Sequence, residues 1–251
     1  VDFLLENIKI QTNLIEASWK YKVKRLLFLG SSCIYPKYAP QPIKEAYLLN
    51  GALEPTNEAY AIAKISGIKL CEALSIEHGF DAISLMPTNL YGEGDYYHSQ
   101  NSHVIPGLIR KFYEAKKNNI NHVTCWGTGR AKREFLYVDD LANACIFTLK
   151  SWDPFSRDAP KRDNNEKLFY LNVGTGKDIQ IKELATLIAS IIGFKGEIRW
   201  DQSKPDGTPQ KLLDTRRINQ LGWEPKIDLK EGLEKTIEIF YKELKNNQLR
   251  I

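Results

Sequence analysis

The stretch VKRLLFLGSS, residues 23–32, decides the fold. Its mainly apolar run from Val23 to Leu29 predicts a strand buried on both faces, which is typical of parallel sheets covered by helices. Gly30 and Ser31 end the run at the point where the carboxyl end of a strand turns into a loop. Ligands of open α/β sheets bind at such strand ends. The stretch therefore predicts a parallel α/β sheet with a ligand site that begins near Gly30.

Helical and strand patterns alternate on both sides of this stretch. Apolar residues spaced three to four apart predict helices, and short continuous apolar runs predict further strands. Asp228 and Glu231 have the spacing of a capping box, which marks a helix start. The expected class is α/β: a Rossmann-like, doubly wound parallel sheet with a smaller α/β substrate domain. The expected helices cover residues 3–19, 57–77, 102–117, 179–192 and 229–244, and the further strands cover 82–86, 122–126 and 169–173.

Composition excludes several classes of protein. With 43% hydrophobic residues and a net charge of +4 over 251 residues, the chain is neither disordered nor collagen-like. The scattered positive charge does not favour nucleic acid as a partner. No apolar run reaches the roughly 20 residues that cross a membrane, and the start lacks a signal-peptide pattern, so we expect a cytoplasmic protein without a membrane partner. The four cysteines lie far apart, which argues against a disulfide framework or a metal site.

Tyr60 and Lys64 are the first pair of residues that suggest chemistry. Four residues apart on a helix, a phenol and an ammonium group share one face. A nearby positive charge favours the tyrosinate, so we expect Lys64 to lower the pKa of Tyr60 and to make it a usable proton donor or acceptor. Taken alone, the spacing is more typical of a plain pair on a helix surface.

Further motifs accompany this pair in a fixed order. They are GSSCIYP at 30–36, LEPTNEAY at 53–60, PTNLYG at 87–92, NSHVIP at 101–106, WGTG at 126–129, REFL at 133–136 and KPDGTP at 204–209. Together they resemble the GDP-L-fucose synthases, a family of extended short-chain dehydrogenases/reductases, over nearly the whole chain. The resemblance implies an NADP(H)-dependent homodimer. Its reaction would be epimerisation of a GDP-4-keto-6-deoxy-D-mannose substrate at C3 and C5, followed by reduction at C4 to GDP-L-fucose.

The resemblance also implies catalytic roles. Protons next to a ketone can be removed only if the enolate oxygen is stabilised, and Tyr60 and Ser31 fit that role. By similarity Cys33 is the base and His103 the acid of the epimerisation. Lys64 would hold the ribose of the cofactor, and Tyr60 would protonate the C4 oxygen during reduction.

Each of these residues also has a simpler structural explanation. Cys33 is equally compatible with a small buried hydrophobic side chain at a strand end. His103 is placed where a side chain can satisfy backbone groups at a helix start, and Ser31 and Ser32 are placed to cap a turn. The four side chains therefore stay candidates at this point.

Binding residues follow from the same resemblance. The implied cofactor contacts are Leu29, Gly30, Ser31, Ser32, Lys64, Pro87, Thr88, Asn89, Leu90 and His103. The implied contacts to the GDP-sugar are Lys111, Trp126, Arg133, Asp206 and Lys211. An arginine can form two parallel hydrogen bonds to phosphate, whereas a lysine offers a point charge. A solvated run of charges explains the residues around Arg133 equally well.

The glycine-rich fingerprint G-x-x-G-x-x-G, which holds pyrophosphate at a helix N-terminus, is absent from residues 1–251. We therefore expect the N-terminal part of the cofactor sheet to be missing, which leaves the strand before Gly30 with an open edge. This absence leaves two alternatives open: another nucleotide-sugar epimerase or dehydratase of the same superfamily, or a noncatalytic, inactive fragment.

The expected domains follow the motifs. Residues 1–90 form a partial NADP-binding domain, to which 134–150 and a strand near 168–178 return. Residues 91–133 and 179–251 form the substrate-binding domain, and 151–167 are an exposed linker or insertion.

Overall fold

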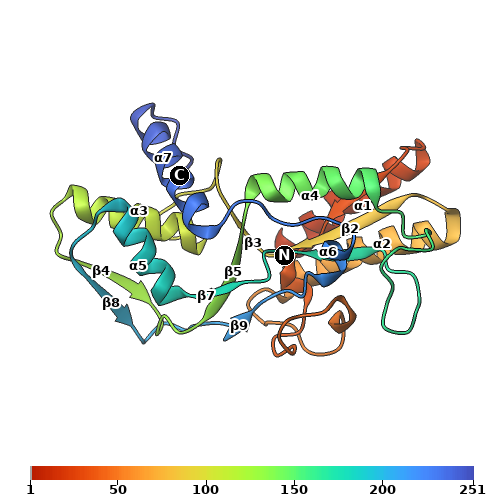
Figure 1. The fold of residues 1–251 in the computed structure, drawn as a ribbon, viewed down its shortest axis with the longest axis horizontal. Coiled ribbons are helices and arrows are strands. Elements are labelled where there is room, and N and C mark those ends of the chain that lie inside the picture. The colour runs from red at the N-terminus through yellow and green to blue at the C-terminus, as the bar shows by residue number, and fades with distance from the viewer. Residues whose placement is uncertain (1) are drawn as a thin grey trace. The chain divides into compact units, whose positions relative to one another are not determined.

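A computed structural model describes residues 2–251, which form two compact units. Of the described residues, unit 1 comprises 2–88, Leu141–Gly176 and Leu212–Glu224, and unit 2 comprises Asn89–Asp140, Lys177–Lys211 and Pro225–Ile251. Both units combine helices with strands that lie mostly parallel, as Figure 1 shows, so the predicted α/β class is confirmed. None of the helices within residues 2–251 has the length and apolar character needed to cross a membrane.

A parallel sheet forms the centre of unit 1. Its strands β1 (Leu26–Leu29), β2 (Ala82–Pro87) and β6 (Tyr170–Val173) pair in the order β1-β2-β6. Leu26 lies opposite Ala82, and Ser84 lies opposite Tyr170. Every residue of β2 is buried, because this strand has a neighbour on each side. The carboxyl ends of β1 and β2 therefore meet at one edge of the sheet, as expected.

Strand β1 is shorter and more exposed than predicted. It lies at the edge of the three-stranded sheet, and Leu29 is 38% exposed whereas Phe28 is buried. Val23 belongs instead to the turn that ends the preceding helix, where its N–H donates to the carbonyl of Ser18 and Lys22 has a φ of +56°. Burial on both faces is thus a property of β2, and the expectation for β1 is wrong.

Two long helices pack against each other beside this sheet. They are α1 (Asp2–Lys20) and α2 (Glu58–His78), and α2 also contacts β1 and β2. Gly67 allows α2 to approach closely, because a Cβ atom there would lie 2.5 Å from the ring of Phe28. α2 ends at Gly79 in the left-handed conformation, an ordinary helix stop. The remaining helices that contribute to unit 1 are η1 (Ser32–Ile34), η2 (Glu45–Tyr47), α4 (Val138–Ser151) and α6 (Arg216–Gln220).

Residues 151–167 are mostly exposed, but parts of the segment pack on unit 1. The Trp152 side chain is completely buried, and Arg162 forms an ion pair with Glu72 of α2. Lys161 and Lys167 form an antiparallel bridge. Because the chain on both sides of the segment belongs to unit 1, no change of unit occurs there.

Unit 2 contains two small sheets and three long helices. Its apolar core includes Phe112 from α3 and Phe240 from α7. The reciprocal capping box occurs at Gln180 and Glu183, while the carboxylate of Asp228 caps α7 through the Glu231 N–H at 2.9 Å, at the predicted helix start. The strands are β3 (Asn89–Tyr91), β5 (Lys132–Tyr137), β7 (Asp178–Gln180) and β9 (Gln210–Lys211) in one sheet, and β4 (His122–Trp126) and β8 (Glu197–Asp201) in the other. The helices are α3 (Val104–Lys117), α5 (Ile181–Ile192) and α7 (Leu229–Lys245).

The two largest differences between the units and the expected domains lie at residues 134–140 and 212–224. Residues 134–140 lie in unit 2, because β5 pairs with β3, β7 and β9 of that unit. Residues 212–224 lie in unit 1, because Leu213 forms a parallel bridge with Ile43 and α6 contacts β6. Both differences arise from pairing between segments that are far apart in the sequence.

Candidate active site and nucleotide-binding surface

The turn that follows β1 carries two candidate catalytic residues. The Gly30 N–H donates to the carbonyl of Leu85 on β2, which fixes the start of the turn. The Ser31 hydroxyl accepts a hydrogen bond from the Cys33 N–H at 3.2 Å, so this serine does cap the turn. Cys33 is a partly exposed thiol outside any disulfide, whereas Ser32 is buried. The turn therefore presents Cys33 rather than burying it in the core.

Tyr60 on α2 joins this turn. Its hydroxyl forms a hydrogen bond with Ser31, and its environment includes the Cys33 thiol. Partial burial raises the pKa of Tyr60, the nearby Cys33 raises it further, and the bond to Ser31 opposes both effects. Three of the predicted catalytic residues, Ser31, Cys33 and Tyr60, thus lie together in unit 1.

Lys64 lies one turn further along α2. Its Nζ donates to the carbonyl of Leu29 at 3.0 Å and lies 5.8 Å from the centre of the Tyr60 ring and 5.0 Å from that of Phe28. Burial lowers the pKa of Lys64. The expectation that Lys64 lowers the pKa of Tyr60 is not met in this arrangement, because the ammonium group faces the ring and a strand carbonyl. The phenol is therefore held in its protonated form, as a donor.

The implied cofactor contacts divide between the two units. Leu29, Gly30, Ser31, Ser32, Lys64, Pro87 and Thr88 lie in unit 1, and Asn89, Leu90 and His103 lie in unit 2. Thr88 is buried, and its N–H donates to the carbonyl of Val173 at 3.0 Å. The Asn89 side chain donates to the carbonyl of Glu134 at 2.8 Å.

His103 occupies the N-cap position of α3. Its carbonyl accepts the Gly107 N–H, but its imidazole makes no capping hydrogen bond and is exposed. Burial raises the pKa of Asp95, and the hydrogen bond from the Tyr96 N–H and the interaction with His103 oppose that rise. The simpler explanation, an imidazole that satisfies the backbone of the helix start, therefore does not hold for His103.

A cationic aromatic surface in unit 2 is formed by Trp126, Lys111 and Lys204. The indole of Trp126 is 61% exposed. The Nζ of Lys111 lies 5.6 Å from the ring centre and that of Lys204 lies 5.8 Å from it. An exposed aromatic ring beside two cations is suited to a flat base carried by a phosphate group. Lys204 was not among the predicted site residues, although it stands in the KPDGTP motif.

The loop beside this surface is held by a carboxylate. Asp206 accepts two hydrogen bonds from Thr128, one from its N–H and one from its hydroxyl, each at 2.6 Å. These bonds, together with the charges of Arg130 and Arg133, lower the pKa of Asp206. Arg133 lies opposite Lys211 in the β5–β9 register, so two further cations are adjacent. Asp206 thus stabilises the loop, and its contact with substrate stays a prediction.

Gly127 offers a test of this loop. A Cβ atom on Gly127 would lie 2.1 Å from the Asp206 carboxylate, and its φ is +76°. Gly94 of the same unit has the same φ with nothing within 4 Å. Gly94→Ala should lower the free energy of unfolding only through its backbone conformation, by roughly 1–2 kcal/mol. Gly127→Ala must also displace Asp206 and so break its hydrogen bonds with Thr128. We expect Gly127→Ala to lose more unfolding free energy in urea and to raise the KM for a GDP-sugar; equal losses in the two variants would contradict the role of Asp206.

The comparison with known proteins decides the family. The model of the NAD dependent epimerase/dehydratase family matches residues 1–157. The chain belongs to this family. It is 54% identical to a putative GDP-L-fucose synthase 2 of Arabidopsis thaliana, an alignment that covers 94% of this chain and 68% of that protein. It is 51% identical to the GDP-L-fucose synthase of Escherichia coli K12, over 95% of this chain and 73% of that protein.

A solved structure supports the same assignment. The GDP-mannoheptose C4 reductase from Campylobacter jejuni, with NADP bound, superposes with a TM-score of 0.83 at 36% identity. The alignment covers 96% of this chain and 76% of the reductase. The resemblance inferred from the motifs is therefore confirmed, as is the Rossmann-like fold of this enzyme family.

The hydrogen-bonding groups of unit 1 suit one part of a nicotinamide cofactor. Tyr60, Ser31 and Lys64 are hydrogen-bonding groups gathered at the carboxyl end of β1, where cofactors of such sheets bind. The exposed Leu29 leaves this strand end accessible. The pyrophosphate has no glycine-rich loop to hold it within residues 1–251. The residues present thus suit the nicotinamide and its ribose.

Proposed function

We propose that this protein converts GDP-4-keto-6-deoxy-D-mannose to GDP-L-fucose with NADPH, through epimerisation at C3 and C5 and reduction at C4. The observation that carries the proposal is the gathering of Ser31, Cys33 and Tyr60 around one strand end. A reductase needs only the phenol, the serine and Lys64. A thiol in the same group is the additional feature that an epimerase of keto sugars would use.

In the proposed epimerisation, Ser31 and Tyr60 donate hydrogen bonds to the C4 oxygen and so stabilise the enolate. Cys33, as the thiolate, removes the proton from C3 or C5. The electrons of the C–H bond form a double bond to C4, and the negative charge of the enolate moves onto the C4 oxygen. His103 returns a proton to the opposite side of the same carbon, and the enolate becomes the ketone again. Water then takes the proton from Cys33 and returns one to His103, so the same pair can serve the second carbon, which also lies directly beside C4.

In the proposed reduction, NADPH, when bound, supplies a hydride to C4. Tyr60 donates its proton to the C4 oxygen, and its raised pKa keeps that proton available at neutral pH. The bond between the Lys64 Nζ and the Leu29 carbonyl places the ammonium group beside the phenol. We infer that unit 1 holds the cofactor and that unit 2 holds the nucleotide of the substrate.

For the nucleotide, the cationic aromatic surface supplies a ring and two charges within 6 Å. Arg133 and Lys211 add charge for the two phosphates. We propose that Trp126 contacts the guanine base.

The test of the function is turnover. Purified protein mixed with NADPH and GDP-4-keto-6-deoxy-D-mannose should oxidise NADPH and yield GDP-L-fucose, identified by NMR. A fluorescence titration with NADPH separates failure of cofactor binding from failure of chemistry. If NADPH binds but other keto or hexose nucleotides are converted instead, the protein is a different epimerase or reductase of the family. If NADPH binds and no nucleotide sugar reacts, the proposed activity is wrong.

We further propose a homodimer formed by α1 and α2. Phe3, Ile10 and Leu14 form one stripe along α1, with exposures of 73%, 66% and 59%, and Ile62 and Ile76 of α2 are also exposed. Two such helix pairs would cover each other in a four-helix contact, because exposed apolar stripes of this kind favour association.

Leu14→Glu should convert the dimer to a monomer in sedimentation equilibrium, since it places a charge in the stripe. Ile120→Glu is the matched control, because Ile120 is 46% exposed in unit 2, outside the two helices. A monomeric wild-type protein would refute the proposed contact.

A further inference from the structure

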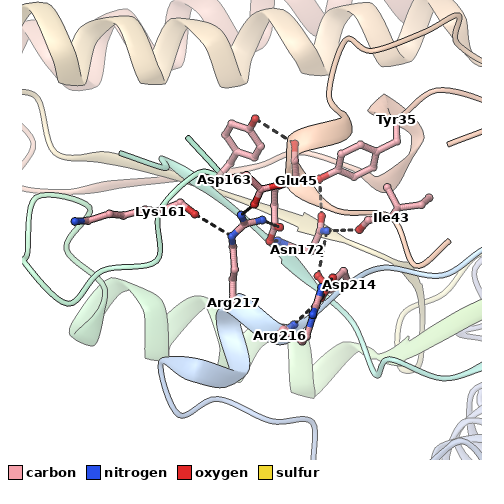
Figure 2. Close-up of polar contacts among 10 residues, drawn as sticks. Tyr35, Ile43, Glu45, Lys161, Asp163, Asn172, Asp214, Arg216 and Arg217 are labelled. Carbon is pink, nitrogen blue, oxygen red and sulfur yellow. Dashed lines mark hydrogen bonds and ion pairs between the residues drawn. The ribbon is translucent and has the colours of Figure 1, made fainter. Parts of the chain in front are cut away.

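A buried polar cluster lies behind the turn that carries Cys33. It consists of Tyr35, Glu45, Asn172 and Arg217, and Figure 2 shows their side chains pointing toward one another. Tyr35, Glu45 and Asn172 are between 0% and 3% exposed. Buried polar groups are stable only when they are hydrogen-bonded, so each bond in this cluster restricts the position of its partners.

Asn172 of β6 uses every polar atom of its side chain. Its Nδ2 donates to the carbonyls of Ile43 and Asp214 at 2.8 and 3.2 Å, and its Oδ1 accepts the Tyr35 hydroxyl at 2.6 Å. Its backbone N–H donates to Glu45 at 3.0 Å. The two donor bonds fix the orientation of the amide, so its acceptor oxygen faces Tyr35.

Glu45 is held in turn by Arg217. The second oxygen of Glu45 accepts a bond from the guanidinium at 2.6 Å, and Arg217 also binds Asp163 at 2.7 Å and the carbonyl of Lys161 at 3.1 Å. Burial raises the pKa of Glu45, while Arg217 and the Asn172 N–H oppose that rise. Segments from η2, the 161–163 loop, β6 and α6 therefore meet at one fixed point.

Tyr35 connects this fixed point to the candidate active site. It is the residue directly after η1, so it stands two positions from Cys33. Burial, followed by the charge of Glu45, raises the pKa of Tyr35 well above its usual value, so the phenol stays a donor. At the other end of the turn, the Ile34 N–H bonds to the carbonyl of Ser31. The turn is thus tied to the cluster by one phenol.

We propose that Tyr35 is a positioning residue for Cys33: its bond to Asn172 determines where the Ser31–Ile34 turn presents the thiol. The part played by Cys33 in the reaction rests on the proposed function, but the position of the thiol does not. The competing interpretation is that the cluster only stabilises the fold.

Tyr35→Phe and Tyr170→Phe separate the two interpretations. Both variants remove one buried hydroxyl from the same cluster, since the Tyr170 hydroxyl donates to the carbonyl of Glu45 at 3.3 Å, but only Tyr35 adjoins the turn. The first readout is alkylation of Cys33 by iodoacetamide, followed by mass spectrometry of its peptide. In Tyr35→Phe, the Cys33 thiol should be alkylated about fivefold faster than in wild type, which corresponds to the free energy of one ordinary hydrogen bond. In Tyr170→Phe, the Cys33 thiol should be alkylated at the wild-type rate.

The second readout is the rate of deuterium uptake by the keto sugar, measured over a range of sugar concentrations. Tyr35→Phe should lower the exchange kcat with an unchanged KM, whereas Tyr170→Phe should change neither. Urea unfolding of both variants shows whether they lose similar stability. Equal alkylation rates in wild type and Tyr35→Phe, or equal acceleration in both variants, would overturn the inference. Absence of exchange in every variant, with the alkylation difference intact, would refute the proposed function while supporting the positioning.

Discussion

Cys33→Ser is expected to abolish hydrogen exchange at C3 and C5 of the keto sugar. A serine fills the same space in the Ser31–Ile34 turn and leaves the backbone bond to Ser31 intact. Its hydroxyl has a pKa far above that of a thiol, however, so it cannot act as the base. General-base catalysis typically contributes about 10²- to 10⁴-fold to a rate, and we expect a loss of that size. The measurement is deuterium uptake from heavy water, followed by mass spectrometry and NMR.

Cys145→Ser is the matched control for this experiment. Cys145 is also a partly exposed thiol of unit 1 outside any disulfide, but it lies on α4 rather than on the turn. It should exchange at the wild-type rate. If Cys33→Ser retains wild-type exchange, then Cys33 is not the base of the epimerisation.

Tyr60→Phe is expected to stop both halves of the reaction. The variant keeps the ring beside Lys64 but removes the donor that stabilises the enolate and later protonates the C4 oxygen. Loss of one such donor lowers kcat by about 10²- to 10³-fold. Tyr60→Phe should lower the rates of both deuterium exchange and NADPH oxidation. Cys33→Ser, in contrast, removes only the base of the exchange step. Tyr38→Phe is the control, because Tyr38 is 79% exposed.

The ionisation of Tyr60 has a defined direction with pH. Because burial raises the pKa of Tyr60 above its ordinary value, the phenol is protonated at neutral pH and ionises only in alkaline solution. Subtracting the ultraviolet titration of Tyr60→Phe from that of wild type should therefore show a tyrosinate midpoint above that of an ordinary tyrosine, about pH 10. A tyrosinate signal near neutral pH would instead support the lowering by Lys64 that the spacing alone predicts.

Periodicity in the sequence located the long elements. The apolar spacing of residues 102–117 and 229–244 predicts α3 and α7 closely, because each helix buries one continuous stripe. Strands β7 and β9 are short and polar, and they exist because β5 lies between them. No local pattern specifies such pairing. The unit boundaries near residues 134–140 and 212–224 also depend on pairing between distant segments, so local sequence patterns do not predict them.

The candidate site was predictable where a motif follows a strand. Ser31 and Cys33 directly follow β1, and Tyr60 lies on the predicted helix that packs beside it, so their meeting follows from the topology. The bond of Asp206 to Thr128 joins residues 78 positions apart, and the cluster around Asn172 joins segments up to 172 positions apart. Such contacts depend on the folded chain. The direction of the Tyr60 pKa shift likewise depends on burial, which spacing does not reveal.

A crystal structure of the protein with NADP and the GDP-keto sugar tests the central claim most directly. The account predicts the C4 oxygen within hydrogen-bond distance of the hydroxyls of Ser31 and Tyr60. It also predicts the sulfur of Cys33 and the imidazole of His103 on opposite faces of the sugar ring, each facing C3 or C5. The contradicting result is a complex in which the C4 oxygen contacts Tyr60 but either Cys33 or His103 lies away from the sugar ring. Such a site could reduce C4 but could not carry out the proposed epimerisation.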